Sequence, residues 1–211
     1  MAAKTLYLIR HAEPDYPNGE KMCLGQKSDL PLGETGLAQA ALLGAAFRRV
    51  PLEAVYTSPL LRAKQTAAHV AGSRPLHVLD SLIELDGGEW DGLPFAQLRA
   101  QYPQHFDRSA SLSCPPGGET DESGLARARA ALSLIEQSTK HCAAIVAHSG
   151  INRILLCSLL GHPMSEKRML KHGFAATGII RYAGGVWTVE ETGVAPEGID
   201  ARIRRSVNRH D

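Results

Sequence analysis

The sequence has no large excess of charge of either sign. Its 23 lysines and arginines nearly balance its 22 aspartates and glutamates over 211 residues, which leaves a formal net charge of +1. A chain with so small a net charge has no overall field that would hold nucleic acid or an anionic membrane surface. We therefore expect no nucleic-acid partner, and any anion that the protein binds must be held by a local cluster of basic side chains.

Cysteines are few, and long apolar runs are missing. The four cysteines, Cys23, Cys114, Cys142 and Cys157, are scattered, and no two have the spacing of metal ligands. We expect them to be reduced thiols in a cytoplasmic protein. The chain begins without the basic region and apolar stretch of a signal peptide, and it contains no run of about 18 apolar residues. Secretion and a membrane location are therefore not expected.

Two common nucleotide-binding motifs are absent as well. The sequence contains no Gly-x-x-x-x-Gly-Lys loop and no Gly-x-Gly-x-x-Gly turn. These glycine patterns bring backbone amides close to the phosphates of nucleotides and dinucleotides. Their absence argues against a Walker site and against a Rossmann dinucleotide site.

What is present is an alternation of short apolar strands and amphipathic helices, which is typical of a three-layer α/β/α domain with a mainly parallel sheet. Strands are expected at 5–9, 54–57, 76–79 and 142–147, with a terminal hairpin at 178–182 and 186–190. Helices are expected at 37–49, 60–71, 95–102, 120–138 and 151–160. We expect one domain over residues 1–211, with a core at about 4–190. Residues 191–211 form a tail that, from Gly198 onward, is expected to be frayed or to face a partner.

Two of the apolar strands lead directly into a histidine. Residues 5–9 precede Arg10 and His11, and residues 142–147 precede His148. Open α/β sheets place their sites at the carboxyl ends of their strands. If the two strands are neighbours, that edge also gathers Arg62 from the first turn of a helix. Spacing alone favours a solvated helix charge for Arg62, whereas for His148 a core histidine is the minor alternative.

The gathered side chains suit an oxyanion. Two guanidiniums, an imidazole and the free amides at the start of the 151–160 helix match a tetrahedral phosphoryl group better than a carboxylate, which needs fewer donors. One neutral imidazole could attack phosphorus, while a carboxylic acid, with its pKa raised by burial or by nearby negative charge, protonates the leaving oxygen. Glu84 is the first candidate for that acid, and Glu13 or Glu89 is the second.

Five segments occur in the order and spacing of the motifs of the histidine phosphatase superfamily, also called phosphoglycerate mutase-like, and the chain resembles that family through about Tyr182. The segments are Leu-Ile-Arg10-His11-Ala-Glu; Thr57-Ser58-Pro59-Leu-Leu-Arg62-Ala63-Lys-Gln-Thr66; Glu84 ahead of Gly88-Glu-Trp90-Asp-Gly92; Pro116-Gly117-Gly118-Glu119; and Val146-Ala-His148-Ser-Gly150.

The resemblance implies a role for each matching side chain. It makes His11 the nucleophile that becomes phosphohistidine, Glu84 the proton donor, and Arg10, Arg62 and His148 the groups that hold the phosphoryl group. Contacts with the substrate are expected from Gly25, Gln26 and Ser149. The resemblance also implies a six-stranded, mainly parallel sheet with one antiparallel edge strand, and a reaction without metal or organic cofactor.

Several functions stay open within this resemblance. The chain looks most like metal-independent phosphatases of small phosphate monoesters, particularly those similar to α-ribazole phosphatase. A phosphoglycerate mutase is the alternative, but the mutase pattern Gly-Glu-Ser-x-x-Asn is replaced by a segment in which Asn18 comes one place late. An inactive phosphate-binding or regulatory protein is a third. The substrate and the oligomeric state stay undetermined, with a homodimer among the alternatives.

Overall fold

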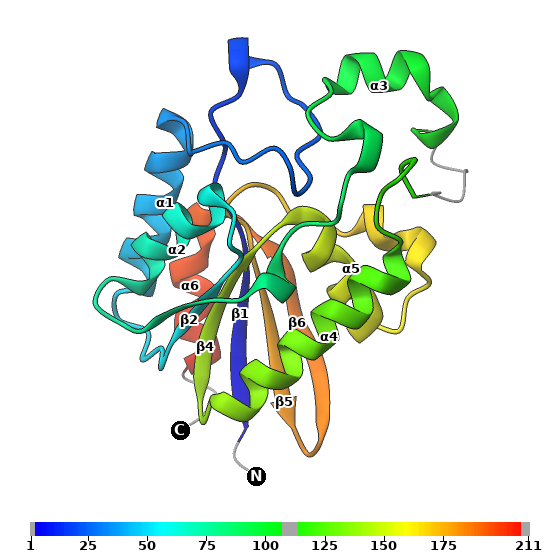
Figure 1. The fold of residues 1–211 in the computed structure, drawn as a ribbon. Coiled ribbons are helices and arrows are strands. Elements are labelled where there is room, and N and C mark those ends of the chain that lie inside the picture. The colour runs from blue at the N-terminus through cyan, green and yellow to red at the C-terminus, as the bar shows by residue number, and fades with distance from the viewer. Residues whose placement is uncertain (1–2, 107–113, 208–211) are drawn as a thin grey trace.

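A computed structural model describes residues 3–106 and 114–207 of the chain, and within them one sheet of six strands forms the centre of the molecule (Figure 1). The strands are β1 (Lys4–Arg10), β2 (Val55–Thr57), β3 (Leu76–Val78), β4 (Cys142–Ala147), β5 (Thr177–Ala183) and β6 (Val186–Val194). Their order is β3-β2-β4-β1-β5-β6. The expected mainly parallel six-stranded sheet is therefore confirmed.

Pairing within the sheet puts the ends of β1 and β4 side by side. These two strands are parallel neighbours, and Arg10 lies opposite Ala147 in their register. The strand that runs against the others is β5, which pairs with β1, while β6 pairs antiparallel to β5 and forms the edge. The predicted terminal hairpin is thus present at the sheet edge.

Helices cover both faces of the sheet because side chains alternate along β1. Tyr7 and Ile9 pack against α1 (Glu34–Phe47), α2 (Leu61–Ala71) and α6 (Ile199–Val207), whereas Leu6 and Leu8 pack against α4 (Asp121–Ser138) and α5 (Ser149–Leu159). Figure 1 shows the short helix α3 (Phe95–Gln101) apart from these layers, beyond the carboxyl ends of the strands. None of the helices in the described ranges is long and apolar enough to cross a membrane.

One expectation about the C-terminus is wrong. Residues 191–194 continue strand β6, and residues 199–207 form helix α6 instead of a frayed or partner-facing tail. The side chains of Ile199 and Ile203 are buried in the core beside α1, and Arg202 forms an ion pair with Glu191 at 3.0 Å. Two isoleucines four positions apart lie on one face of a helix, and burying that face outweighs the polarity of the surrounding residues.

Candidate functional site

Two buried histidines lie together where β1 and β4 end. His11 follows β1 and His148 follows β4, and their ring centroids are 5.1 Å apart. The amide of His11 donates a hydrogen bond of 2.9 Å to the carbonyl of Ala147, which continues the ladder between the two strands. Parallel pairing thus brings two imidazoles from distant parts of the chain to one point.

The backbone around His11 determines which ring nitrogen carries the proton. Its Nδ1 lies 2.7 Å from the carbonyl oxygen of Ala12, which can only accept a hydrogen bond. Nδ1 therefore carries the proton and Nε2 has the free lone pair. Burial lowers the pKa of His11 well below its usual value of 6.5, and the positive charges of Arg10 and Arg62 lower it further. The imidazole is neutral, which is the state that a nucleophile requires.

His148 is oriented from behind by a hydroxyl. Its Nε2 lies 2.6 Å from the Oγ of Ser58, and that Oγ accepts a hydrogen bond from the amide of Leu60 at 3.3 Å. The hydroxyl can donate its own proton to Nε2, and in that tautomer the ring proton is on Nδ1. Ser58 does not cap helix α2, because the N-cap residue of that helix is Leu60. The side chain of Ser58 orients the imidazole instead.

Arg62 is fully buried, so it is not the solvated charge that its spacing suggests. It lies in the first turn of α2 and donates from Nη1 to the carbonyl of Ser28 at 2.8 Å and from Nη2 to that of Gly25 at 3.0 Å. Burial lowers the pKa of the guanidinium, and the negative charge of Glu84 partly offsets this effect. Two carbonyls of the 14–32 loop therefore fix the orientation of this cation.

Arg10 is held by different partners. It donates from Nη1 to the carbonyl of His172 at 3.1 Å, and its guanidinium lies 3.8 Å from the ring centroid of Phe174. Contact of a guanidinium with the face of an aromatic ring is favourable and leaves the N–H groups at its edge free for other acceptors. Burial lowers the pKa of Arg10 to about 10. The side chain stays charged at neutral pH and keeps a fixed direction.

Three buried N–H groups at this point have no acceptor among the described residues. They are Nε of Arg10, Nε of Arg62 and Nδ1 of His148. A buried donor without a partner costs about 1–3 kcal/mol, so such groups are rarely left unused. Together with the two positive charges, they form a set of donors suited to an oxyanion with several oxygens.

Glu84 binds the start of helix α5. Its carboxylate oxygens accept hydrogen bonds from the amides of Leu85 at 2.9 Å and of Gly150 and Ile151 at 3.0 Å each. The helix N-terminus therefore holds a carboxylate of the protein itself. Our expectation that these amides contribute to the anion site is wrong for Gly150 and Ile151. The same contacts place the Glu84 carboxylate on the wall of the cavity that His11 also lines.

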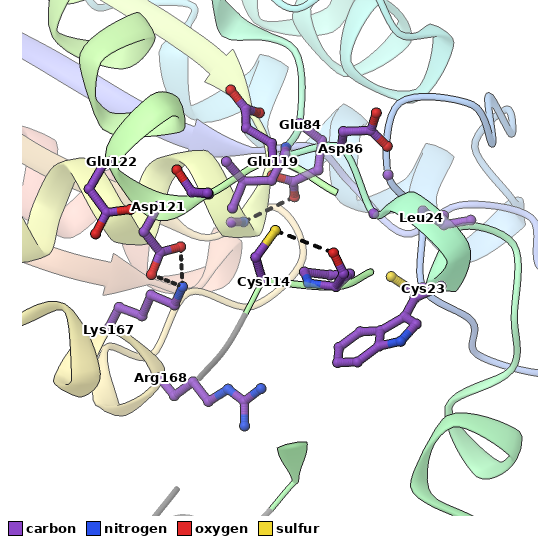
Figure 2. A pocket seen from close by; sticks show the side chains of 17 residues that line it. Cys23, Leu24, Glu84, Asp86, Cys114, Glu119, Asp121, Glu122, Lys167 and Arg168 are labelled. Atoms are coloured by element: carbon purple, nitrogen blue, oxygen red, sulfur yellow. Dashed lines mark hydrogen bonds and ion pairs between the residues drawn. The ribbon is translucent and has the colours of Figure 1, made fainter. Parts of the chain in front are cut away.

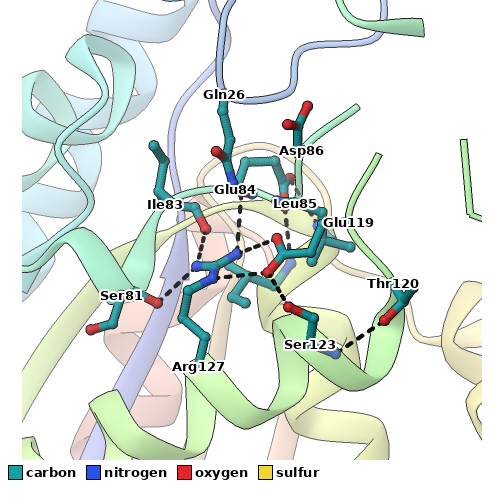
Figure 3. Close-up of polar contacts among 12 residues, drawn as sticks. Gln26, Ser81, Ile83, Glu84, Leu85, Asp86, Glu119, Thr120, Ser123 and Arg127 are labelled. Atoms are coloured by element: carbon teal, nitrogen blue, oxygen red, sulfur yellow. Dashed lines mark hydrogen bonds and ion pairs between the residues drawn. The ribbon is translucent and has the colours of Figure 1, made fainter. Parts of the chain in front are cut away.

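A half-buried ion pair holds the backbone around Glu84 (Figure 3). Arg127 on α4 pairs with Glu119 at 2.7 Å and donates to the carbonyls of Ser81, Ile83 and Glu84 at 2.9, 2.7 and 3.3 Å. Gln26 donates to the same Glu84 carbonyl at 2.8 Å. A carboxylate from the Pro116-Gly117-Gly118-Glu119 segment thus fixes an arginine that in turn fixes the segment carrying Glu84. We call Glu119 and Arg127 the clamp pair.

Two cavities meet at Glu84. The first, of about 260 Å³, is lined by residues of four segments, namely Arg10, His11, Tyr16, Met22, Cys23, Leu24, Glu84, Phe95, Ser149 and Arg153. The second, of about 340 Å³, lies on the other side of Glu84 and is shown in Figure 2. Its walls include the ion pair between Lys167 and Asp121. Burial raises the pKa of the Cys23 thiol to about 12, so this side chain is a protonated wall residue of both cavities.

The remaining predicted site residues differ in whether they line either of the two cavities. Ser149 lines the cavity beside His11, whereas Gly25 lines the second cavity and Gln26 lines neither of them. Glu13 lies outside both cavities and pairs with Lys21 at 3.3 Å, and Glu89 is exposed at the surface. Of the three candidate acids, only Glu84 lines the cavity that His11 also lines.

Sequence reasoning missed three contributors to the site. These are Ser58 behind His148, Phe174 under Arg10, and Arg153 on the cavity wall. The sequence contains a signal for Ser58, which stands in one of the five motif segments, and for Arg153, which lies four residues after Ser149 and therefore on the same helix face. In the described ranges, no cluster of three or more histidine, cysteine, aspartate or glutamate side chains is placed to hold a metal ion.

Comparison with known proteins places this geometry in a family. A family model described as the histidine phosphatase superfamily (branch 1) matches residues 6–194. Phosphoserine phosphatase 1 of Hydrogenobacter thermophilus is 32% identical over 168 residues, which cover 76% of this chain and 78% of that protein. The mycobacterial glucosyl-3-phosphoglycerate phosphatase has a structure that matches with a TM-score of 0.80 and 26% identity, over 92% of this chain and 100% of the other.

An α-ribazole phosphatase from Shigella flexneri also matches in structure. The TM-score is 0.75 at 23% identity, and the match covers 90% of this chain and 96% of the other. At that identity the likeness shows a common fold and no more.

Proposed function

The chain belongs to the histidine phosphatase superfamily, branch 1, and from this premise we propose that it hydrolyses small phosphate monoesters through a phosphohistidine at His11. The single observation that carries the proposal is the hydrogen bond from Nδ1 of His11 to the Ala12 carbonyl at 2.7 Å. It leaves the Nε2 lone pair free in a buried, neutral ring beside two guanidiniums. Among the described residues that line this cavity, His11 supplies the only imidazole.

In the first step, Nε2 of His11 attacks phosphorus and the bond from phosphorus to the ester oxygen breaks. Arg10, Arg62 and Nδ1–H of His148 stabilise the charge on the equatorial oxygens, which is the main contribution that a protein makes to phosphoryl transfer. Glu84 gives its proton to the departing alcohol oxygen.

In the second step, water attacks the phosphohistidine. Glu84, now ionised, takes the proton of the water as its oxygen bonds to phosphorus, and the bond from phosphorus to Nε2 breaks. Inorganic phosphate leaves, and His11 and Glu84 return to their starting states. The reaction needs no metal because the arginines supply the positive charge.

For the substrate class, we propose small, soluble phosphate monoesters. Relatives named for phosphoserine and for glucosyl-3-phosphoglycerate support a small-molecule substrate. The motif resemblance keeps α-ribazole phosphate among the compounds to test. Met22 and Leu24, from the loop between β1 and α1, and Phe95, at the start of α3, line the cavity.

The test uses purified protein with a metal chelator and p-nitrophenyl phosphate at mildly acidic pH. We expect hydrolysis by the native protein and by His69→Ala, a control at an exposed histidine on α2, and none by His11→Ala. Activity that survives in His11→Ala would overturn the mechanism. With 3-phosphoglycerate, a phosphatase releases phosphate, whereas a mutase isomerises the compound. Phosphate binding without turnover of any ester would instead favour a regulatory protein.

A further inference from the structure

The cavity beside His11 contains a guanidinium that the proposed reaction does not use. Arg153 lies on α5, one turn after Ser149, and both residues line this cavity. The Nε of Arg153 donates to the carbonyl of Leu170 at 3.0 Å, which fixes the plane of the guanidinium. Burial lowers the pKa of Arg153, and the negative charge of Glu84 partly offsets that effect. The side chain is thus partly withdrawn from water and held in place.

The two terminal nitrogens of Arg153 have nothing to bind within the described part of the protein. Neither Nη1 nor Nη2 has an acceptor there, and no carboxylate lies within 4.0 Å of this side chain. Arg127 makes a useful comparison, because it is also half-buried and yet uses all three of its nitrogens on carbonyls and on Glu119. Four N–H bonds of Arg153 therefore remain available to a ligand in the cavity.

Neutralising Glu84 does not account for Arg153. The two charges attract each other, but they form no ion pair, and the oxygens of Glu84 already accept three backbone N–H bonds. The phosphoryl group does not account for it either. Arg10, Arg62 and His148 already supply three unpartnered donors for that group.

We propose that Arg153 binds a carboxylate on the alcohol portion of the substrate, so that the enzyme prefers phosphate monoesters of small hydroxy acids. This inference rests on the proposed phosphatase function. The flat, forked pair of Nη groups matches a carboxylate in two parallel hydrogen bonds. One guanidinium balances one carboxylate charge, and in the described residues Arg10 is the only other positively charged side chain on this cavity wall. A cavity of about 260 Å³ suits an alcohol of few carbon atoms.

The test compares 3-phosphoglycerate with glycerol 3-phosphate, which carries a hydroxymethyl group in place of the carboxylate. Both esters are used as competitors of p-nitrophenyl phosphate, so that each inhibition constant is measured whether or not the ester is turned over. For the native protein we expect 3-phosphoglycerate to bind at least about tenfold more tightly, since a hydrogen bond to a charged group is worth about 1.5–3 kcal/mol.

The variants then assign that preference to Arg153. Arg153→Met keeps the length of the side chain without its donors and should bring the ratio of the two inhibition constants close to one. Arg153→Lys keeps the charge without the fork and should restore part of the ratio. Arg129→Met, at an exposed arginine on α4, should keep the native ratio.

The outcomes distinguish this inference from the function beneath it. A native ratio near one, or a ratio that Arg153→Met leaves unchanged, overturns the carboxylate site while the phosphatase stands. Absence of p-nitrophenyl phosphate hydrolysis by the native protein overturns both. The native ratio needs no variant, so the proposal can fail even if Arg153→Met does not fold.

Discussion

Replacing Arg127 by methionine tests how the protein positions Glu84. The substitution removes the ion pair with Glu119 at 2.7 Å and the bonds to the carbonyls of Ser81, Ile83 and Glu84. The exposed fractions of the two clamp side chains are 20% and 13%, so the pair is largely shielded from water. Glu119 is then left without its cation, and the segment carrying Glu84 loses its contact with α4.

Two magnitudes follow from these contacts. Leaving a partly buried charged group without its hydrogen-bond partner costs about 1–3 kcal/mol, which for a chain of this size lowers the melting temperature by roughly 2–12 °C. General acid catalysis contributes about 10²–10⁴-fold to a rate, which sets the largest effect of a displaced Glu84. An alkoxide leaving group needs the proton, whereas p-nitrophenolate departs without one. We therefore expect kcat to fall about 10-fold to 100-fold more for glycerol phosphate than for p-nitrophenyl phosphate.

The assay measures kcat for both esters at a temperature below the transition of the variant, with melting followed by circular dichroism. Arg129→Met, two residues further along α4 at an exposed position, is the matched control and should alter neither quantity. Equal losses on the two esters would mean that Arg127 only stabilises the fold. An unchanged kcat in a protein of lowered stability would refute the positioning role altogether.

Three further results are expected. Three histidines are buried in the neutral form, so below pH 6.5 the unfolded chain binds more protons than the folded protein does. The free energy of unfolding measured in urea should therefore fall by about 4 kcal/mol from about pH 7.5 to pH 5.5. A free energy of unfolding that does not change with pH would contradict the burial of these histidines in the neutral form. The histidines concerned, whose pKa values burial lowers, are His11, His148 and His172. Phe174→Leu removes the ring 3.8 Å from the Arg10 guanidinium and should raise KM about tenfold with a smaller change in kcat; an unchanged KM would show that the ring does not orient Arg10. Ile199→Ala should destabilise the fold by about 2–5 kcal/mol in thermal melts, since this side chain is fully buried, whereas a loose tail would show no effect.

The positions of the strands along the chain could be predicted from the sequence, and the reason is physical. An apolar run of five or six residues that ends in a polar group has few places in an α/β protein other than the centre of a sheet. That pattern located β1 and β4, and with them His11 and His148. The register shows that the two strands are neighbours, which was the condition for gathering His11 and His148 at one edge of the sheet.

The limits of sequence reasoning lie in contacts between segments far apart in the chain. The spacing of Arg62 does not show that its guanidinium is buried, or that it donates hydrogen bonds to carbonyls more than thirty residues away in the sequence. The amides at the start of α5 bind Glu84, which only the folded arrangement of the 82–92 segment could show. Helix α6 was predicted to be a tail because most of its residues are charged or polar. Only two isoleucines, Ile199 and Ile203, form the buried face that packs it against the core.

The covalent intermediate is the part of the mechanism that one measurement tests most directly. The native protein, mixed with a phosphate monoester and quenched in alkali within one turnover, is digested and its phosphorylated residue is identified by mass spectrometry, with phosphorus NMR to assign the ring nitrogen. The free lone pair on His11 predicts phosphate on Nε2 of that residue, in acid-labile form. Phosphate on any other side chain, or turnover by His11→Ala, would contradict the account.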